Sequence, residues 1–187
     1  MDDNSNLKGL ENFVLLVLGS INRPLSLLHL EKEVFLLWNF HPSIKNYLHF
    51  IKHYRGPFSV EIERIAKNPF YLENCWDYIP PKKGDDLSGG YLKLNQNGEV
   101  KYSHLFEQAN ANPSLQNLLT GVKMVRELYD NLTLEELLLL IYDTYPEYRE
   151  KSNVFFKIFD KREILAKKMR SKGIIDDERY NLLVSGI

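Results

Sequence analysis

The chain has 187 residues, of which 44% are hydrophobic and 12% aromatic, so it has enough apolar surface for one large domain or two small ones. Because 24 Lys and Arg residues balance 25 Asp and Glu residues, no global positive field attracts nucleic acid, and any such binding must come from a local patch. A single cysteine excludes an intramolecular disulfide. The first residues lack signal-peptide features, and no apolar run reaches the roughly 20 residues of a membrane span. We therefore expect a soluble cytoplasmic protein with no membrane partner.

Two amphipathic helices are predicted at the beginning of the chain. Apolar residues recur at helical spacing over residues 7–21, and the pattern ends before Pro24. Ser26 is a suitable N-cap for a second helix, which continues until Pro42 interrupts it. We expect the charged residues 31–33 of this helix to face water.

The next segments are less regular. Residues 43–54 fit both a helix and an alternating strand, and both alternatives stay open. The turn Gly56–Ser59 ends in an N-cap candidate, which predicts a third helix that runs to about residue 68. Residues 80–90 are rich in Pro, Gly and charge, so we expect a mobile loop there.

Residues 91–102 predict a β-hairpin. Side chains alternate between apolar and polar in Leu92-Lys93-Leu94, and Asn97-Gly98 supplies residues that tolerate the positive φ of a tight hairpin turn. A small hairpin after three helices is typical of a winged helix. We therefore expect a winged-helix-like unit over residues 7–107.

The second half of the chain is predicted to be helical throughout. One helix is expected over residues 115–129, and Thr133 opens the next with a capping box. A further continuous helix is expected over residues 153–172, ending at Gly173. The predicted fold class is thus mainly α with a small β-hairpin, in which the winged-helix-like unit is followed by a helical region over residues 113–187.

Three short motifs carry a family resemblance. They are Tyr54–Ser59, in which Gly-Pro is followed by an aromatic residue and Ser, Tyr145–Tyr148, and the basic segment Lys161–Ala166. The chain resembles uncharacterised small prokaryotic proteins with a winged-helix-like unit and, more distantly, the Panacea-domain proteins related to SocA-like antitoxins. This resemblance implies a non-enzymatic protein that binds a partner protein, its own promoter, or both.

Positive charge is concentrated near the end of the chain. Residues 149–172 contain nine basic and three acidic residues, a local charge of +6 in a chain whose total is −1. On one continuous helix, four lysines would form a stripe that could follow a phosphate backbone: Lys157, Lys161, Lys168 and Lys172. The alternative is an ordinary solvated helix face paired with the acidic stretch 127–147.

The predicted hairpin adds Lys93 and Lys101 as candidate phosphate contacts. However, the third helix begins with Glu61 and Glu63, whereas helices that read bases usually present Arg, Asn, Gln or Ser. Sequence-specific reading of DNA by this helix is therefore the weaker interpretation.

Aromatic residues crowd the junction between two of the C-terminal helices. Most of them are expected in the core, but Phe156 lies off the apolar face of its predicted helix. We select Phe156 and Tyr148 as candidate contacts with a partner protein.

No motif indicates a catalytic, metal or phosphate site. His49 and His53 have the spacing of metal ligands on a helix, but no Cys-x-x-Cys or carboxylate pattern supports a metal, and structural or surface histidines are the better interpretation. We therefore expect neither an enzyme nor a cofactor.

The sequence predicts a regulatory or antitoxin-like binding protein that uses the winged helix and the basic helix on DNA. The alternative is a pure protein-interaction module, a subunit or adaptor, whose partner is another protein or a second copy of the chain.

Overall fold

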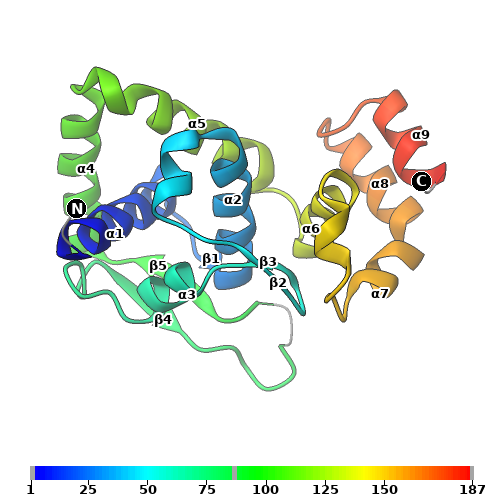
Figure 1. Ribbon diagram of the computed structural model, residues 1–187, viewed down its shortest axis with the longest axis horizontal. Helices are drawn as coiled ribbons and strands as arrows, with labels where there is room; N and C mark the ends of the chain where they lie inside the picture. The colour runs from blue at the N-terminus through cyan, green and yellow to red at the C-terminus, as the bar shows by residue number, and fades with distance from the viewer. Residues whose placement is uncertain (1–2, 86–87, 186–187) are drawn as a thin grey trace. The chain divides into compact units, whose positions relative to one another are not determined.

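The computed structural model describes residues 3–85 and 88–185, which Figure 1 shows as a chain that is mainly helical with small sheets. Its helices are α1 (Asp3–Ser20), α2 (Leu27–Phe40), α3 (Val60–Lys67), α4 (Gln96–Asn110), α5 (Pro113–Tyr129), α6 (Leu134–Thr144), α7 (Phe155–Asp160), α8 (Arg162–Ser171) and α9 (Asp177–Ser185), with the short 3-10 helices η1 (Pro42–Asn46) and η2 (Pro146–Arg149). Its strands are β1 (Leu25–Ser26), β2 (Ile51–His53), β3 (Gly56–Phe58), β4 (Trp76–Ile79) and β5 (Tyr91–Leu94).

The chain forms two compact units. The first comprises the residues up to Phe50 together with Ser59–Glu127, and the second comprises Ile51–Phe58 together with the chain from Leu128 onward. This division differs from the expected one, which places the boundary near residue 110. Most of α5 belongs with the first unit, and the β2–β3 hairpin belongs with the helices that follow α5.

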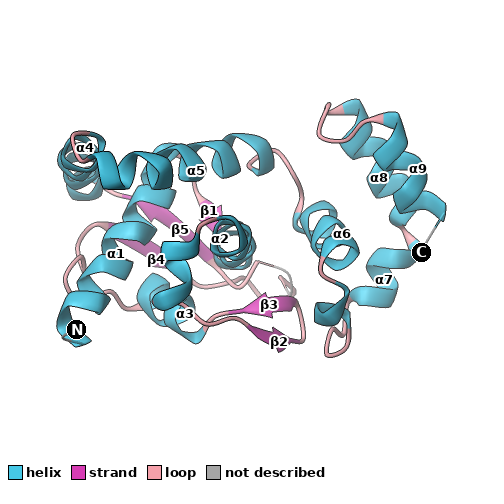
Figure 2. Cartoon of the chain, turned by 45° about the horizontal axis from the view of Figure 1, so that its top comes forward, coloured by secondary structure: helices cyan, strands magenta, loops and turns pink. Residues whose placement is uncertain are grey.

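The first unit combines helices with an antiparallel sheet of strand order β1-β5-β4. Figure 2 shows α1 running across this sheet, where it contacts β5. The alternation predicted for β5 is confirmed, since Leu92 and Leu94 are buried while Tyr91 and Lys93 are exposed. The connection from β4 to β5 coincides with the predicted loop 80–90, of which residues 86–87 lie outside the described residues.

The hairpin expected over residues 91–102 is wrong beyond β5. Strand β5 pairs with β4, and the chain after it forms α4 instead of a second hairpin strand. The side chain of Asn95 accepts a hydrogen bond from the backbone N–H of Gly98 at 3.1 Å, so this asparagine acts as a helix N-cap. The Asn97-Gly98 pair therefore lies in the first turn of a helix.

The helix starts predicted at Ser26, Ser59 and Thr133 are confirmed. Each side-chain hydroxyl accepts a hydrogen bond from a backbone N–H in the first turn, and Thr133 forms the full capping box with Glu136. The open segment 43–54 divides between the two alternatives, because it contains most of η1 and then β2.

The expectation that residues 31–33 face water is wrong. Glu31, Lys32 and Glu33 are buried within α2, which is buried from Leu27 to Leu37. Glu33 accepts two hydrogen bonds from Nη1 of Arg126, at 2.8 and 3.0 Å, and Lys32 lies 3.1 Å from a carboxylate oxygen of Glu31. A buried charge is tolerated when such a partner is supplied, and here α5 provides it for Glu33.

The second unit packs the β2–β3 hairpin against the C-terminal helices. The backbone N–H of Asn153 donates to the carbonyl of Tyr54 at 2.9 Å, and the Lys52 ammonium lies 2.7 Å from a carboxylate oxygen of Glu150. Gly56 has a φ of +82° and approaches α6 so closely that a Cβ there would lie 2.9 Å from Leu138. The hairpin is thus an integral part of this unit.

The single helix expected over residues 153–172 is wrong, because the structure divides it into α7 and α8 at Lys161. The backbone N–H of Lys161 bonds to the carbonyl of Ile158, and Lys161 ends α7 while it precedes the first residue of α8. The predicted end at Gly173 is confirmed, since this glycine has a φ of +71° after the last turn of α8.

Candidate interaction surface

An aromatic cluster in the second unit joins α6 to α7. The ring of Phe155 meets Tyr142 edge-on with centroids 5.6 Å apart, and it lies 5.5 Å from the ring of Phe159. The guanidinium groups of Arg149 and Arg162 cover Phe155 and Phe159, at 5.4 and 4.3 Å from the ring centres. These contacts fix the orientation of the short helix α7.

Hydrogen bonds tie this cluster to the surrounding backbone. The hydroxyl oxygens of Tyr142 and Ser152 are 2.6 Å apart, and Nε of Arg149 donates to the carbonyl of Tyr142 at 2.6 Å. Burial raises the pKa of Tyr142 to about 12, against the opposing effect of the Ser152 hydrogen bond. The tyrosine hydroxyl is therefore neutral and available for this hydrogen bond at ordinary pH.

Phe156 projects from this cluster into solvent. Its side chain is 74% exposed, although its ring centroid lies only 5.2 Å from that of Phe155. The predicted position off the apolar face of its helix is confirmed. An exposed phenyl ring on a fixed support is typical of the aromatic anchors of protein interfaces.

Tyr148, the other predicted partner contact, lies inside the protein. It belongs to η2 and is only 8% exposed, and burial raises the pKa of its hydroxyl group. The expectation that it presents its ring to a partner is wrong. The Tyr145–Tyr148 motif instead closes α6 with a turn that packs its last tyrosine into the second unit.

Two of the four lysines of the expected basic stripe are engaged in ion pairs. The ammonium group of Lys161 lies 3.0 Å from a carboxylate oxygen of Glu135, and that of Lys172 lies 2.7 Å from one of Glu136. Lys172 also donates to the backbone carbonyl of Asn131 at 2.9 Å. The acidic first turn of α6 therefore neutralises part of the basic segment, as the alternative interpretation of the charge pattern predicts.

The side chains of Lys157 and Lys168 are exposed and form neither a hydrogen bond nor an ion pair with any described residue. Because the helix breaks at Lys161, these two lysines belong to different helices, α7 and α8. The continuous stripe that the sequence predicts is therefore absent from the described part of the chain. The positive charge that remains available is smaller than the local excess of +6 suggests.

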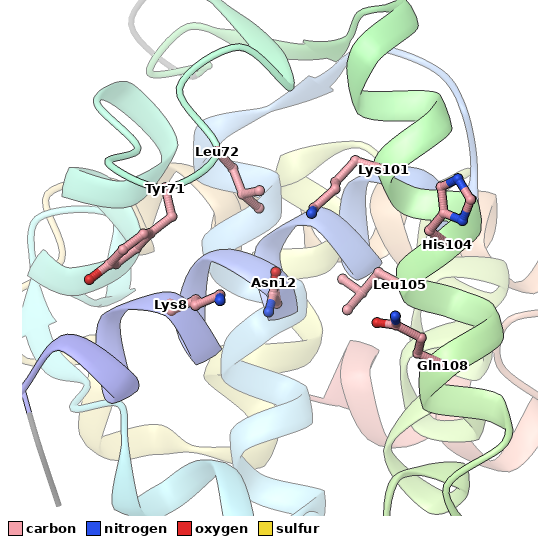
Figure 3. Close-up of a pocket in the computed structure, with 8 residues that line it drawn as sticks. All are labelled: Lys8, Asn12, Tyr71, Leu72, Lys101, His104, Leu105 and Gln108. Carbon is pink, nitrogen blue, oxygen red and sulfur yellow. The ribbon is translucent and has the colours of Figure 1, made fainter.

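The structure separates the two lysines of the predicted hairpin. Lys93 is exposed on β5, opposite Asp77 of β4 in the strand register. Lys101 lies on α4 and lines a pocket together with residues of α1 (Figure 3). The two lysines thus do not share one wing.

His49 and His53 do not share a helix, because His53 lies in β2 and His49 precedes that strand. Across residues 3–85 and 88–185, no group of three His, Cys, Asp or Glu side chains is arranged to hold a metal ion. Over the same ranges, no helix has both the length and the apolar character that crossing a membrane requires.

Sequence reasoning did not single out Arg149 and Ser152, which hold the aromatic cluster in place. Their roles depend on contacts with α6 that are formed across a turn, and no periodic pattern marks such contacts.

Comparison of the chain with protein-family models, with curated proteins and with solved structures finds no match. The candidate surface is therefore defined by its own geometry.

Proposed function

We propose that this protein is a non-enzymatic binding protein whose second unit docks a partner protein around Phe156. The observation that carries this proposal is the 74% exposure of a phenyl ring on a helix fixed by an aromatic cluster. A ring that is already held in place loses little conformational freedom on binding, so most of the free energy of its burial is available for affinity. This is the protein-interaction alternative of the sequence analysis.

The surroundings of the ring indicate the chemistry of the partner. Lys157 follows Phe156 in the chain, is exposed, and has no carboxylate partner among the described residues. We expect the partner to present an apolar pocket with an acidic residue at its edge. The resemblance to antitoxin-related proteins supports a protein as the occupant, either a toxin or a sister subunit.

The test compares Phe156→Ala with Ile164→Ala, which removes an apolar side chain that is 61% exposed on α8 of the same unit. Tagged protein is purified from its native cells, and the recovered partner is then titrated against each variant. We expect Phe156→Ala to weaken binding by about 30-fold or more and Ile164→Ala to leave it nearly unchanged, with affinity retained in high salt. Equal affinity of both variants and the wild type would contradict the proposal.

A second candidate function is nucleic-acid binding by the first unit. Its support is the order of elements: α1, β1, α2 and α3 precede β4 and β5, and the sheet order is β1-β5-β4. This order is typical of winged helices. Exposed lysines are available on the β4–β5 connection and on β5, namely Lys82, Lys83 and Lys93. Against this candidate, the half-buried face of α3 carries Glu61 and a Glu63–Lys67 ion pair.

The second candidate is tested by fluorescence anisotropy with labelled duplex DNA at several salt concentrations. Binding through phosphates should weaken by about one unit of log–log slope for each phosphate that is neutralised. Lys83→Glu and Lys93→Glu should weaken binding, whereas Lys168→Glu, on α8 of the second unit, should leave it nearly unchanged. Affinity that does not change with salt would exclude this candidate.

A further inference from the structure

A pocket of about 460 Å³ lies in the first unit, next to α1, α4 and the chain after α3. Its volume falls in the range of natural small-molecule sites. Figure 3 shows the residues that line it, which are Lys8, Asn12, Tyr71, Leu72, Lys101, His104, Leu105 and Gln108. Neither the exposed ring of Phe156 nor the lysines of β5 and α8 belong to this pocket.

The walls of the pocket are held in place by buried contacts. The carboxylate of Glu11 is fully buried and accepts hydrogen bonds from three successive backbone N–H groups, those of residues 70–72, at 2.7, 2.7 and 2.9 Å. These bonds fix the segment that carries Tyr71 and Leu72 against α1. The shape of the pocket is therefore built into the fold of the first unit.

The opposite wall is positioned by close contact between α1 and α4. The backbone of Gly19 lies so near Tyr102 that a Cβ at this position would be 2.2 Å from the ring. Tyr102 and Leu105 in turn pack on a core cluster that contains Leu16 of α1. Lys101, His104 and Gln108, on the same helix α4, are thereby placed at the pocket.

The lining of the pocket is positively charged. It contains two lysines and one histidine, and no Asp or Glu side chain is among the lining residues. Glu11, which precedes Asn12 of the lining, directs its carboxylate to the three backbone N–H groups described above. An anionic group in the pocket would therefore meet positive charge without a competing carboxylate in the lining.

Four polar side chains of the lining have no partner among the described residues. Lys8, Asn12, Lys101 and Gln108 form no side-chain hydrogen bond or ion pair with any described residue. Figure 3 shows the ammonium groups of the two lysines and the amides of Asn12 and Gln108 turned toward the same space, with His104 at the rim. Several donors therefore converge on one hollow and remain available to a ligand.

We propose that this pocket binds a small organic molecule that carries a phosphate group. The two ammonium groups balance the two negative charges of a phosphate monoester, and lysine is a common phosphate ligand in proteins. The amides of Asn12 and Gln108 supply neutral donors. The ring of Tyr71 with Leu72 and Leu105 provides an apolar wall for the organic part of the ligand.

The proposal is tested by recording amide NMR spectra of the full-length chain during titration with phenyl phosphate, inorganic phosphate and phenol. We expect phenyl phosphate to shift the signals of α1, α4 and residues 70–72 saturably, inorganic phosphate to shift the same signals with lower affinity, and phenol to shift none. Sodium chloride at matched ionic strength serves as the control. Absence of saturable shifts with both phosphates, or identical shifts with chloride, would overturn the proposal.

Variants assign the binding to the pocket. Lys8→Met and Lys101→Met should each weaken phenyl phosphate binding by about tenfold or more, because each removes one of the two ammonium groups. Lys123→Met is the matched control, since Lys123 is an exposed lysine of α5 in the same unit that pairs with Glu127 and lies outside the lining. The assignment of binding to this pocket would be overturned if both pocket variants kept the wild-type affinity for phenyl phosphate, or if Lys123→Met lost as much affinity as they do. The outcome does not depend on whether Phe156 binds a partner protein.

Discussion

The ion pair between Arg126 and Glu33 is the residue-level contact that connects α5 to α2. Both side chains are completely buried, and one nitrogen of Arg126 donates to both carboxylate oxygens. His29 lies 3.4 Å from the same carboxylate. Desolvation of the two charges is costly, so removal of one partner is expected to cost more than the intact pair contributes.

Arg126→Met is therefore expected to reduce the free energy of unfolding by about 3–5 kcal/mol, because it leaves the carboxylate of Glu33 buried without its guanidinium partner. The double variant with Glu33→Met should recover at least half of this loss. Urea-induced unfolding of the wild type, both single variants and the double variant measures the effect. If the loss of unfolding free energy in the double variant equalled the sum of the losses in the two single variants, the two side chains would not interact.

Tyr142 gives the protein a pH dependence in the alkaline range. Its folded-state pKa is raised by burial to about 12, whereas that of a free tyrosine is about 10. A raised pKa means that the stability from the neutral hydroxyl is fully present below pH 10 and is lost as the pH rises toward 12. Tyr142→Phe should cost about 1 kcal/mol near neutral pH, through the lost hydrogen bond to Ser152, and progressively less above about pH 10.

Guanidinium unfolding of the wild type and of Tyr142→Phe at several pH values measures this difference. Ser152→Ala is the matched control, since it removes the same hydrogen bond and keeps the phenol. If the difference between Tyr142→Phe and the wild type stayed constant up to about pH 11, the proposed titration of the buried phenol would be wrong.

The burial of individual side chains could be predicted where it follows from helix periodicity and not where it depends on a distant partner. The spacing of the apolar residues around Phe156 correctly indicated that its ring lies outside the core. Helix periodicity also predicted that residues 31–33 face water. Nothing near them in the sequence indicates that Arg126, more than ninety residues later, supplies the compensating charge. Tyr148 was missed for a related reason, since its burial depends on a turn and not on a repeat.

At the level of elements, the start of α4 shows how two local signals compete. Asn97-Gly98 favours a tight turn, but Asn95 caps a helix that contains both residues. The glycine is still required there, for a different reason. A Cβ at Gly98 would lie 1.8 Å from the backbone carbonyl oxygen of Cys75, so the segment that leads into β4 approaches α4 too closely for any side chain.

Gly98→Ala is accordingly expected to destabilise the protein by about 3 kcal/mol, because the backbone at Cys75 must move to admit a methyl group. Gly9→Ala is the matched control, since Gly9 lies within α1 and a Cβ there would meet nothing within 4 Å. This control should be stabilised by up to about 1 kcal/mol through helix propensity. Thermal unfolding followed by circular dichroism measures both changes, and similar shifts in the two variants would contradict the steric argument.

Helix starts were the best predicted elements, because a cap is decided by neighbouring residues in the sequence. Ser26, Ser59 and Thr133 each behave as their local sequence indicates. The partner of β5 could not be predicted from the local alternation, since pairing with β4 crosses the connection over residues 80–90. The break between α7 and α8 at Lys161 contains neither proline nor glycine, the residues that usually indicate the end of a helix in a sequence.

At the level of the whole molecule, the second unit is discontinuous in sequence. Residues 51–58 leave the first unit, form the β2–β3 hairpin against α6 and η2, and are followed by α3 of the first unit. The composition of the C-terminal helices predicts a separate region, because nothing in it shows that these helices require a hairpin encoded much earlier. The ion pair between Lys52 and Glu150 joins two positions far apart in the chain.

A fragment that contains only residues 128–187 is therefore expected to be incompletely folded. Without the hairpin, the side chains of Leu138 and Tyr142 that pack near Gly56 are left uncovered. Addition of a synthetic peptide spanning residues 50–59 should increase the dispersion of the amide NMR signals of the fragment. A peptide with Gly56→Val is the control, since its side chain would meet Leu138 and its φ of +82° suits only glycine. A fragment that is fully folded without any peptide would contradict this expectation.

The separation between the hairpin and its partners has a consequence for biosynthesis. The carbonyl of Tyr54 receives its hydrogen bond from Asn153, which is translated about a hundred residues later. At a synthesis rate of roughly 5–20 residues per second, the β2–β3 hairpin is made on the order of 5–20 s before the residues that it packs against in the second unit. During that interval its unpaired strand edges are open to chaperones and to neighbouring nascent chains, so the speed of translation itself is expected to influence the yield of correctly folded protein.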